Sequence, residues 1–485
     1  MALLSSIRSL TLDLPPSCIQ FCPARPEIFA VGTYFLHRNE DSVSSQENSA
    51  DSLQTTNSDS SSAENAAAVL PQKRTGSLIL YKISHDKNIT EVFSLATDFA
   101  ILDLQWAPHP NRLVGSNDPL LAVAASTGLL AFYRLKTRPP ASDTASQQQS
   151  QTELVLSCVN QVTNDTTLVL SLTWHPVRPN VLGLTLSDGR VVLCMSEGRD
   201  EHADAAVVAC WDPNAVFSMH DVHEHELEAW IMNFTPEKDE KVLSGGDDMI
   251  LLCSQDTASA QTDPAEEQEY AMQWQDRKLH HAGVTAILPL SDTLVVTGSY
   301  DDHIRLLSLP AVGRRKVLAE LNLGGGVWRL KLLTPPSSHV AQPSHIESGG
   351  GISSTSTADA DHGSGQHTLA PPMSALQDHQ DQNQTTSSHF VLLCSCMHAG
   401  TRVVRLQRSS SRKEEDEYEW TFSVIARFEE HESMNYASDV QPRSDDDVGD
   451  SLQKTTIVST SFYDKLLCVW QIDDETLREP QQETS

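Results

Sequence analysis

Long apolar runs and positive charge are both scarce in this sequence. No stretch of about 18 or more apolar residues could cross a bilayer as a helix, and the N-terminal stretch MALLSSIRSLTLDLPPS lacks the continuous apolar core of a signal peptide. Lys and Arg number 34 against 65 Asp and Glu, a formal net charge of −31. Such a chain repels nucleic acid and anionic membranes, so we expect no nucleic-acid partner and no membrane insertion.

The cysteines show no pairing pattern. There are nine, an odd number, none is spaced as CxxC, and several lie in apolar runs such as VVLC and LLCVW. A zinc ribbon is excluded because paired ligands are missing. Scattered cysteines in apolar runs are typical of buried free thiols in a reducing compartment, so the sequence predicts an intracellular, cytoplasmic protein.

Motifs of several common enzyme classes are also missing. The sequence holds no GxSxG nucleophile elbow, no HExxH zinc motif and no phosphate-binding glycine loop. The cluster HDVHEHE, with His220, His223 and His225, could hold a metal ion, but it lies in an expected connecting loop and His225 has another predicted partner. We therefore expect no metal and no cofactor.

Low-complexity segments interrupt the chain. They are rich in Ser, Thr, Asn and Gly and nearly free of large apolar side chains, so they cannot bury enough surface to offset the entropy of ordering. Much of the negative charge lies in them. The expected disordered insertions are residues 38–74, 137–152, 255–270, 334–388, 408–418 and 438–454, with a disordered tail at 473–485.

The remaining sequence repeats a strand, a tight turn and a second strand. Examples are VLGLTLSDGRVVLC (181–194), LSGGDDMILLCS (243–254) and VTGSYDDHIRLL (296–307). Alternating apolar and polar residues around a short turn predict antiparallel hairpins. Seven such units recur at about 40 to 45 residues, the period of WD40 blades. The sequence thus predicts one all-β domain over residues 1–472, a seven-bladed WD40 β-propeller with long disordered insertions.

Several of these turns carry an aspartate with a structural role. In WD40 blades this carboxylate usually accepts a hydrogen bond from a His in the loop before the first strand. The expected pairs are His225 with Asp248, His280 or His281 with Asp301, and His431 with Asp464. We also expect a strand around residues 9–14 to pair outside the last blade, because this closes the ring and removes a free sheet edge.

The sixth repeat departs from this pattern. Its turn, CMHAG, carries His398 in place of an aspartate, and Gly324, Gly325 and Gly326 precede its first strand. The two segments are expected on the same face, near the channel mouth. A neutral His can act as a general base and aimed backbone N–H groups can stabilise an oxyanion. The alternative is that the glycines only turn the chain and His398 caps the turn.

Aromatic side chains accompany the same turns and strand starts. Trp230, Tyr300, Trp328 and Tyr463 lie where they could face the channel or pack between blades. Each taken alone is explained by packing. Together they would offer ring faces that attract a cation.

A succession of motifs resembles one WD40 family. AVGTY, HELEAWIMNF, SGGDD, TGSYDDHI, GGVWR, CMHAG and SFYDKLLCVW follow one another between residues 27 and 472. This succession is similar to the diphthine methylesterases of the diphthamide pathway. The resemblance implies a carboxyl methyl ester hydrolase acting on the methylated diphthine intermediate of translation elongation factor 2. Demethylation would free the carboxylate for the final, amide-forming step.

A mechanism for this chemistry is a hypothesis from the residues present. His398 would activate water, or a hydroxyl or thiol such as Ser395 or Cys396, and the amides of residues 324–326 would hold the oxyanion. The trimethylammonium group of the intermediate would be oriented by aromatic rings and by nearby carboxylates. These substrate-binding residues would be Trp230, Tyr300, Trp328, Tyr463, Asp247 and Asp302.

Two non-enzymatic interpretations stay open at the level of sequence. Most WD40 proteins are platforms, so a scaffold for protein complexes in trafficking or ubiquitin ligase assembly is one alternative. The other is a reader of methylated lysine, which also uses aromatic rings but has no turnover. Loss of turnover on replacing His398 by Ala, with the fold intact, would separate the esterase from both.

Overall fold

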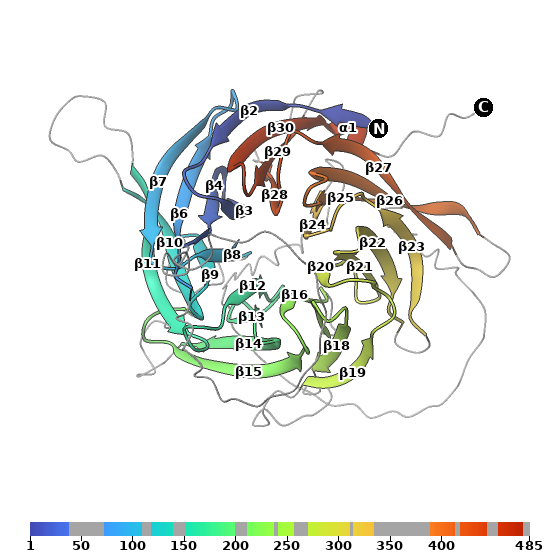
Figure 1. The fold of residues 1–485 in the computed structure, drawn as a ribbon, viewed down its shortest axis with the longest axis horizontal. Coiled ribbons are helices and arrows are strands. Elements are labelled where there is room, and N and C mark those ends of the chain that lie inside the picture. Colours follow the sequence, from blue (N-terminus) through green and yellow to red (C-terminus); the bar gives the residue numbers. More distant parts are fainter. Residues whose placement is uncertain are drawn as a thin grey trace, which may run out of the picture.

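The computed structural model describes residues 1–37, 72–108, 118–138, 151–198, 211–236, 241–256, 270–310, 314–333, 389–412, 418–443 and 454–478. In this part of the chain every element but one short helix is a β-strand, and the strands form seven sheets arranged in a ring (Figure 1). The predicted seven-bladed β-propeller is confirmed. No helix among these residues is long and apolar enough to span a membrane.

The first four blades are antiparallel sheets whose four main strands pair in chain order, although long segments separate some of these strands in the sequence. Blade one contains β3 (Pro16–Cys22), β4 (Arg25–Thr33), β6 (Arg74–Ile83) and β7 (Ile89–Thr97), with β5 (Phe35–Leu36) also paired to β6. Blade two contains β8 (Ile101–Trp106), β9 (Leu120–Ala125), β10 (Leu129–Arg138) and β11 (Gln151–Gln161). Blade three contains β12 (Val169–Trp174), β13 (Val181–Leu186), β14 (Arg190–Glu197) and β15 (Val216–Glu224). Blade four contains β16 (Ala229–Phe234), β17 (Lys241–Gly246), β18 (Leu251–Asp256) and β19 (Tyr270–Asp276).

The last three blades complete the ring. Blade five contains β20 (Val284–Pro289), β21 (Leu294–Ser299), β22 (His303–Ser308) and β23 (Lys316–Asn322). Blade six contains β24 (Arg329–Leu333), β25 (His389–Ser395), β26 (Thr401–Arg412) and β27 (Tyr418–Phe428). Blade seven contains β28 (Ala437–Val440), β29 (Lys454–Ser461) and β30 (Leu466–Asp473), and helix α1 (Asp474–Leu477) follows.

The N-terminal segment closes the ring, as the sequence predicts. Strand β2 (Ser6–Thr11) pairs antiparallel with β30 and becomes the outer strand of blade seven. Strand β1 (Ala2–Leu4) was not expected, and it pairs in parallel with β27 of blade six. The first eleven residues therefore tie the last two blades together, and neither outer edge is left free along these pairings.

Apolar side chains of neighbouring blades pack between the sheets. Between blades two and three, Phe132 stacks on Trp211 with ring centroids 4.5 Å apart, and Trp174 meets Trp211 edge to face at 5.7 Å. Between blades six and seven, Phe428 lies parallel to Trp470 at 5.1 Å. Successive side chains of a strand point to opposite faces of its sheet, so each blade can present apolar side chains to the neighbouring blade.

Polar side chains of the innermost strands link each blade to the next around the channel. Each link joins the innermost strand of one blade, or a residue just before it, to the innermost strand of the next blade. They join Asp439 to the N–H of Phe21, Gln20 to the N–H of Trp106, Asp103 to the N–H of Leu172, Thr173 to the carbonyl of Met232, Asn233 to that of Ile287, Thr285 to that of Val327, and Lys331 to Asp439. All seven blade junctions are crossed by such a bond.

One of the three predicted His–Asp pairs forms a hydrogen bond between side chains. Nδ1 of His225 lies 3.0 Å from Asp248, as predicted. The other two pairs differ, because nearer groups take their place. Asp301 pairs with Arg305 at 2.9 Å, whereas His280 bonds to Thr297 and the ring of His281 stays 3.8 Å from the carboxylate. His431 bonds to Ser459 at 2.8 Å, and Asp464 accepts the N–H of Glu432.

Strands extend into several of the segments that were expected to be disordered insertions. Strand β26 runs to Arg412, β11 begins at Gln151 and β28 covers 437–440. The expected disordered tail also starts differently, because α1 follows β30 directly and its Leu477 is buried against blades six and seven. Residues 38–71, 139–150, 257–269, 334–388, 413–417, 444–453 and 479–485 lie outside the described residues.

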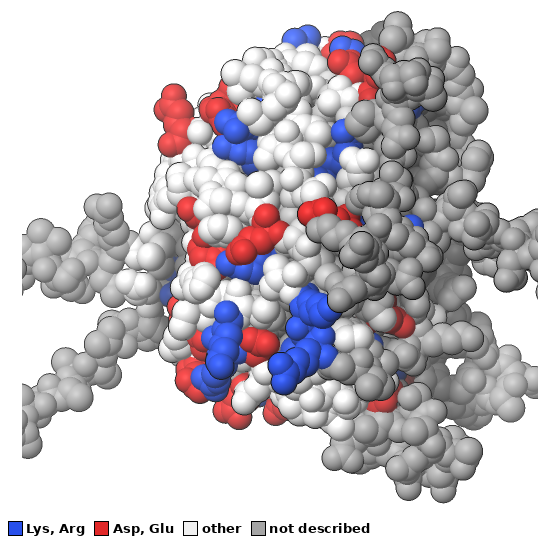
Figure 2. Space-filling view, turned by 90° about the vertical axis from the view of Figure 1, so that its right-hand side faces the viewer, with Lys and Arg blue, Asp and Glu red and all other residues white. Residues whose placement is uncertain are grey.

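The cysteines follow the sequence prediction. The eight described cysteines are buried and free of disulfides, namely Cys18, Cys22, Cys158, Cys194, Cys253, Cys394, Cys396 and Cys468. Cys210 lies outside the described residues. On the side of the propeller where blades five and six lie, Lys and Arg alternate with Asp and Glu, so this view shows no surface of one sign (Figure 2).

Candidate active site

Four aromatic rings meet at one mouth of the central channel. Trp230 from β16, Tyr300 from the β21–β22 turn and Trp328, just before β24, contact one another with centroid distances of 5.4 to 6.3 Å. Tyr436, just before β28, contacts Trp328 at 5.1 Å. All four rings are partly exposed. We call these four residues the aromatic cluster; the sequence predicted three of them and missed Tyr436.

Tyr463 lies outside this cluster. It is 70% exposed and contacts Phe462 edge to face at 5.0 Å. Phe462 in turn contacts Tyr436 at 5.4 Å and Tyr34 at 6.2 Å. The rings therefore continue from the aromatic cluster toward blades seven and one, and Phe462 makes ring contacts with both Tyr436 and Tyr463.

The two predicted carboxylates take different places. Asp247 accepts a hydrogen bond from the indole N–H of Trp230 at 3.1 Å, which places its charge against the aromatic cluster. Asp302 lies in the β21–β22 turn with φ 68°, and its carbonyl accepts the N–H of Leu323 at 2.8 Å. Its charge adds to the burial that raises the pKa of Cys396. Asp302 is thus directed to the junction of blades five and six.

The predicted glycines do lie against the turn of blade six. A Cβ on Gly325 would come within 2.5 Å of the carbonyl oxygen of Cys396, and one on Gly326 within 2.9 Å of the Met397 sulfur. Both glycines are buried, and their N–H groups have no hydrogen-bond partner among the described residues. Gly324 differs, because its N–H donates to Asn322 at 2.8 Å. Two of the three predicted oxyanion donors are therefore available, and a buried N–H without a partner is unusual.

His398 sits at the tip of that turn. The turn is held by bonds of 2.8 Å from the N–H of Cys396 to the carbonyl of Gly400 and from the N–H of Ala399 to the carbonyl of Cys396. The imidazole is exposed and makes no hydrogen bond or ring contact within the described part of the chain. It therefore does not cap the turn, and its nitrogens are open to water.

The two hypothetical nucleophiles of blade six are unsuited to attack. Cys396 is fully buried, and burial raises the pKa of its thiol to about 12. Ser395 is 1% exposed and donates to Ser438 within a network of hydroxyl and amide groups that contains no His. A nucleophile needs a base beside it or a lowered pKa. Neither residue is therefore placed for a covalent step in this structure.

A Ser–His–Asp chain occurs in blade four, but it is structural. His225 bonds through Nδ1 to Asp248 and through Nε2 to Ser244, the connectivity of a catalytic triad. Ser244 is fully buried and also bonds to His223, whose other nitrogen bonds to Ser254. No substrate could reach this serine. The same bonds occupy the nitrogens of two of the three histidines that had been considered as metal ligands.

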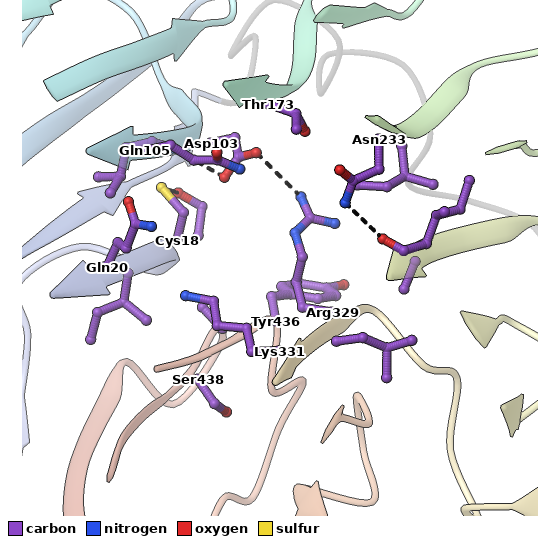
Figure 3. Close-up of a pocket in the computed structure, with 18 residues that line it drawn as sticks. Cys18, Gln20, Asp103, Gln105, Thr173, Asn233, Arg329, Lys331, Tyr436 and Ser438 are labelled. Carbon is purple, nitrogen blue, oxygen red and sulfur yellow. Dashed lines mark hydrogen bonds and ion pairs between the residues drawn. The ribbon is translucent and has the colours of Figure 1, made fainter. Parts of the chain in front are cut away.

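The channel holds a polar cavity of about 170 Å³ beneath the aromatic cluster (Figure 3). Arg329 from β24 reaches toward Asp103 of β8 on the opposite wall, with 3.9 Å between Nη2 and Oδ2. Lys331 pairs with Asp439 at 2.8 Å. Burial raises the pKa of the Asp103 carboxyl. Tyr436 also lines the cavity, which therefore extends to the cluster.

Two charged residues in expected core strands are the sequence signal for this cavity. Arg329 is the last residue of the motif GGVWR, and Asp103 is the one charged residue of the strand ILDLQW. A charge at an expected core position predicts a partner or a function. Their meeting across the ring could not be foreseen, because blades two and six are far apart in sequence.

Several known proteins that share one name are similar to this chain in sequence. No protein-family model matches it. A protein of Schizosaccharomyces pombe named diphthine methyltransferase is 26% identical over 401 residues, covering 82% of this chain and 86% of the relative. Proteins of the same name from Mus musculus and Saccharomyces cerevisiae are each 23% identical, covering 89% and 96% of this chain and 69% and 97% of their own lengths. Over most of its length the chain is similar to proteins named diphthine methyltransferase.

This relationship confirms the family resemblance read from the motifs. The alignments to diphthine methyltransferases extend over most of the chain, as the motif succession from residue 27 to 472 does. The shared name places these relatives in diphthine chemistry and in the handling of a methyl group. The name says methyltransferase, whereas the motif resemblance implies a methylesterase.

Proposed function

We propose that this protein is a carboxylic ester hydrolase that removes the methyl ester from methylated diphthine on translation elongation factor 2, acting in the cytoplasm. The observation that carries the proposal is the aromatic cluster with Asp247 hydrogen-bonded to Trp230 at the channel mouth. The cluster lies beside the turn of blade six that carries the exposed imidazole of His398. The N–H groups of Gly325 and Gly326, which lie against this turn, have no hydrogen-bond partner among the described residues. The relatives named diphthine methyltransferase support the substrate class.

The cluster suits the cationic part of such a substrate. Ring faces attract a quaternary ammonium by about 0.5 to 2 kcal/mol, and the carboxylate of Asp247 adds an opposite charge. Burial raises the pKa of Tyr300 and Tyr436, so both phenols stay neutral near pH 7. The three rings of Trp230, Tyr300 and Trp328 contact one another, so a ligand would lie against their exposed surfaces and not between them.

Blade six supplies groups for hydrolysis. In the proposed reaction His398 takes a proton from water, and the water oxygen forms a bond to the ester carbonyl carbon. The N–H groups of Gly325 and Gly326 donate to the carbonyl oxygen as it gains negative charge. The bond to the methoxy oxygen then breaks, His398 returns the proton to that oxygen, and methanol leaves. The product is a carboxylate, and one proton is released to solvent.

Methyl transfer to diphthine is the second candidate, favoured by the name of the relatives. The two reactions run in opposite directions and have different requirements. A transferase needs a methyl donor such as S-adenosylmethionine, whereas the hydrolase needs only water. The presence of a donor therefore separates them in one assay.

The decisive test is intact-protein mass spectrometry of elongation factor 2. Elongation factor carrying the methylated intermediate, and a second sample carrying diphthine, are each incubated with the purified protein, with and without S-adenosylmethionine. We expect the methylated sample to lose the mass of one CH₂ unit and to release methanol without the donor. A gain of that mass by diphthine, only with the donor, would establish the transferase instead. No change in either sample would favour the non-catalytic scaffold.

Replacing Trp328 by Leu tests the cation site. We expect a KM for the methylated elongation factor that is about 2- to 30-fold higher, because the central ring of the cluster is lost. The value of kcat should change less, because Trp328 is not placed at the reacting carbonyl. The matched control is Trp420→Leu, in the outer strand β27, where the indole stacks on Phe390 at 6.3 Å. Equal KM values for both variants would contradict a role of the cluster in binding.

A further inference from the structure

Arg329 is a cation in the channel whose hydrogen-bonding capacity the protein hardly uses. Its Nη1 donates to the carbonyl of Trp328 at 3.1 Å, and its Nη2 lies 3.9 Å from Asp103, too far for a hydrogen bond. The structure shows no further partner for it among the described residues. A guanidinium has five N–H donors, so most of them are left to the channel. The side chain is only 18% exposed.

The other charged groups of the channel are already engaged. Asp103 accepts the N–H groups of Leu104 and Leu172, and Asp439 accepts that of Phe21 and the ammonium of Lys331. Asp247 adds a third carboxylate at the aromatic cluster, where it accepts the indole N–H of Trp230. A ligand that carries both signs could place its cation near Asp247 and its anion near Arg329, whereas a simple anion has only the second of these partners.

The donors of Arg329 adjoin the aromatic cluster directly. The guanidinium carbon is 5.1 Å from the centroid of the Trp328 ring, and Tyr436 of the cluster lines the same cavity as Arg329. The cavity, about 170 Å³, is large enough for a carboxylate with accompanying water. Figure 3 shows Arg329 beside Tyr436, the member of the cluster that lines the cavity, so a group that binds anions adjoins a surface that attracts quaternary ammonium.

We propose that this channel mouth binds a betaine-type zwitterion, with its carboxylate on Arg329 and its quaternary ammonium on the aromatic cluster. The inference rests on the proposed function for the identity of the natural ligand, since ester hydrolysis next to a trimethylammonium group yields such a zwitterion. A carboxylate offers two charged oxygens to a guanidinium, whereas a methyl ester offers one neutral carbonyl oxygen. Arg329 thus favours the product over the ester and makes the product an inhibitor.

Binding of two small probes to the full-length protein tests this independently of turnover. Glycine betaine carries both groups, and choline carries the quaternary ammonium without the carboxylate; both are titrated by calorimetry. We expect wild type to bind glycine betaine about 10- to 100-fold more tightly than choline, the contribution of a hydrogen bond to a charged group. Arg329→Gln should remove this preference, because glycine betaine loses the partner of its carboxylate and choline no longer meets a like charge, and Arg329→Lys should retain part of it.

The matched control is Arg315→Gln. Arg315 also lies over an indole, 4.3 Å from the Trp274 ring, and pairs with a carboxylate, Asp276, but its partners belong to blade four's outer strand β19. This variant should bind both probes as wild type does. Equal affinities of wild type for glycine betaine and choline, or a preference that survives in a folded Arg329→Gln variant, would overturn the inference. Absence of ester hydrolysis with the preference present would instead remove only the proposed function.

Discussion

Replacing His398 by Ala is expected to lower kcat for ester hydrolysis by about 10²- to 10⁴-fold, the usual contribution of a positioned general base. The imidazole is exposed and has no partner in the described part of the chain, so its removal leaves no buried group unsatisfied. The melting temperature should therefore stay close to that of wild type. KM should change little, because the cluster that binds the cation is intact.

His85→Ala provides the control for this variant. His85 is exposed in the β6–β7 turn of blade one, on the opposite face of the propeller from the β25–β26 turn that carries His398. It should hydrolyse the ester at the wild-type rate. Added imidazole should restore part of the activity of His398→Ala. It would not restore activity that was lost because the variant had unfolded. Hydrolysis at the normal rate by His398→Ala would move the general base elsewhere in the channel, while leaving the substrate class untouched.

Mild acid is expected to unfold the propeller well before its carboxylates are protonated. Burial lowers the pKa of His223 to about 3 and the pKa values of His280 and His431 to about 4, and the positive charge of Arg305 adds to the effect at His280. In the unfolded chain these groups titrate near pH 6.5. Below that value the unfolded state binds protons that the folded state does not, so stability falls as pH falls from about 6.5 toward 4.

The size of this effect can be measured by urea unfolding at several pH values. Three such groups give a slope approaching about 4 kcal/mol per pH unit once all three are protonated in the unfolded chain. Asp248 and Asp301 have lowered pKa values, about 2 for Asp301. The stability that these carboxylates contribute to the fold is lost only at more acid pH, so it does not affect the measurement between pH 7 and 5. His223→Gln should reduce the slope by about a third, whereas His85→Ala should not change it. A midpoint that is constant between pH 7 and 5 would contradict the prediction.

Local sequence patterns predicted the scaffold well and the contacts of single side chains less well. The aspartates of three turns were recognised, but only Asp248 has the expected imidazole partner, because Arg305 and Ser459 offer closer partners to Asp301 and His431. Cys396 was considered as a nucleophile from its place beside His398. The structure buries it completely, and burial removes that possibility by raising its pKa.

The sequence by itself determined the seven-bladed architecture, the closure of the ring by the N-terminal strand and the relationship to the diphthine methyltransferases. These depend on short hairpins, on their period and on motifs in fixed order, all of which are local. Only the tertiary structure decided that Arg329 faces Asp103, that Tyr436 joins the cluster and that the N–H groups of Gly325 and Gly326 stay free. The reason is that ring closure brings together the starts of innermost strands from distant repeats, and no local pattern encodes which side chains then meet.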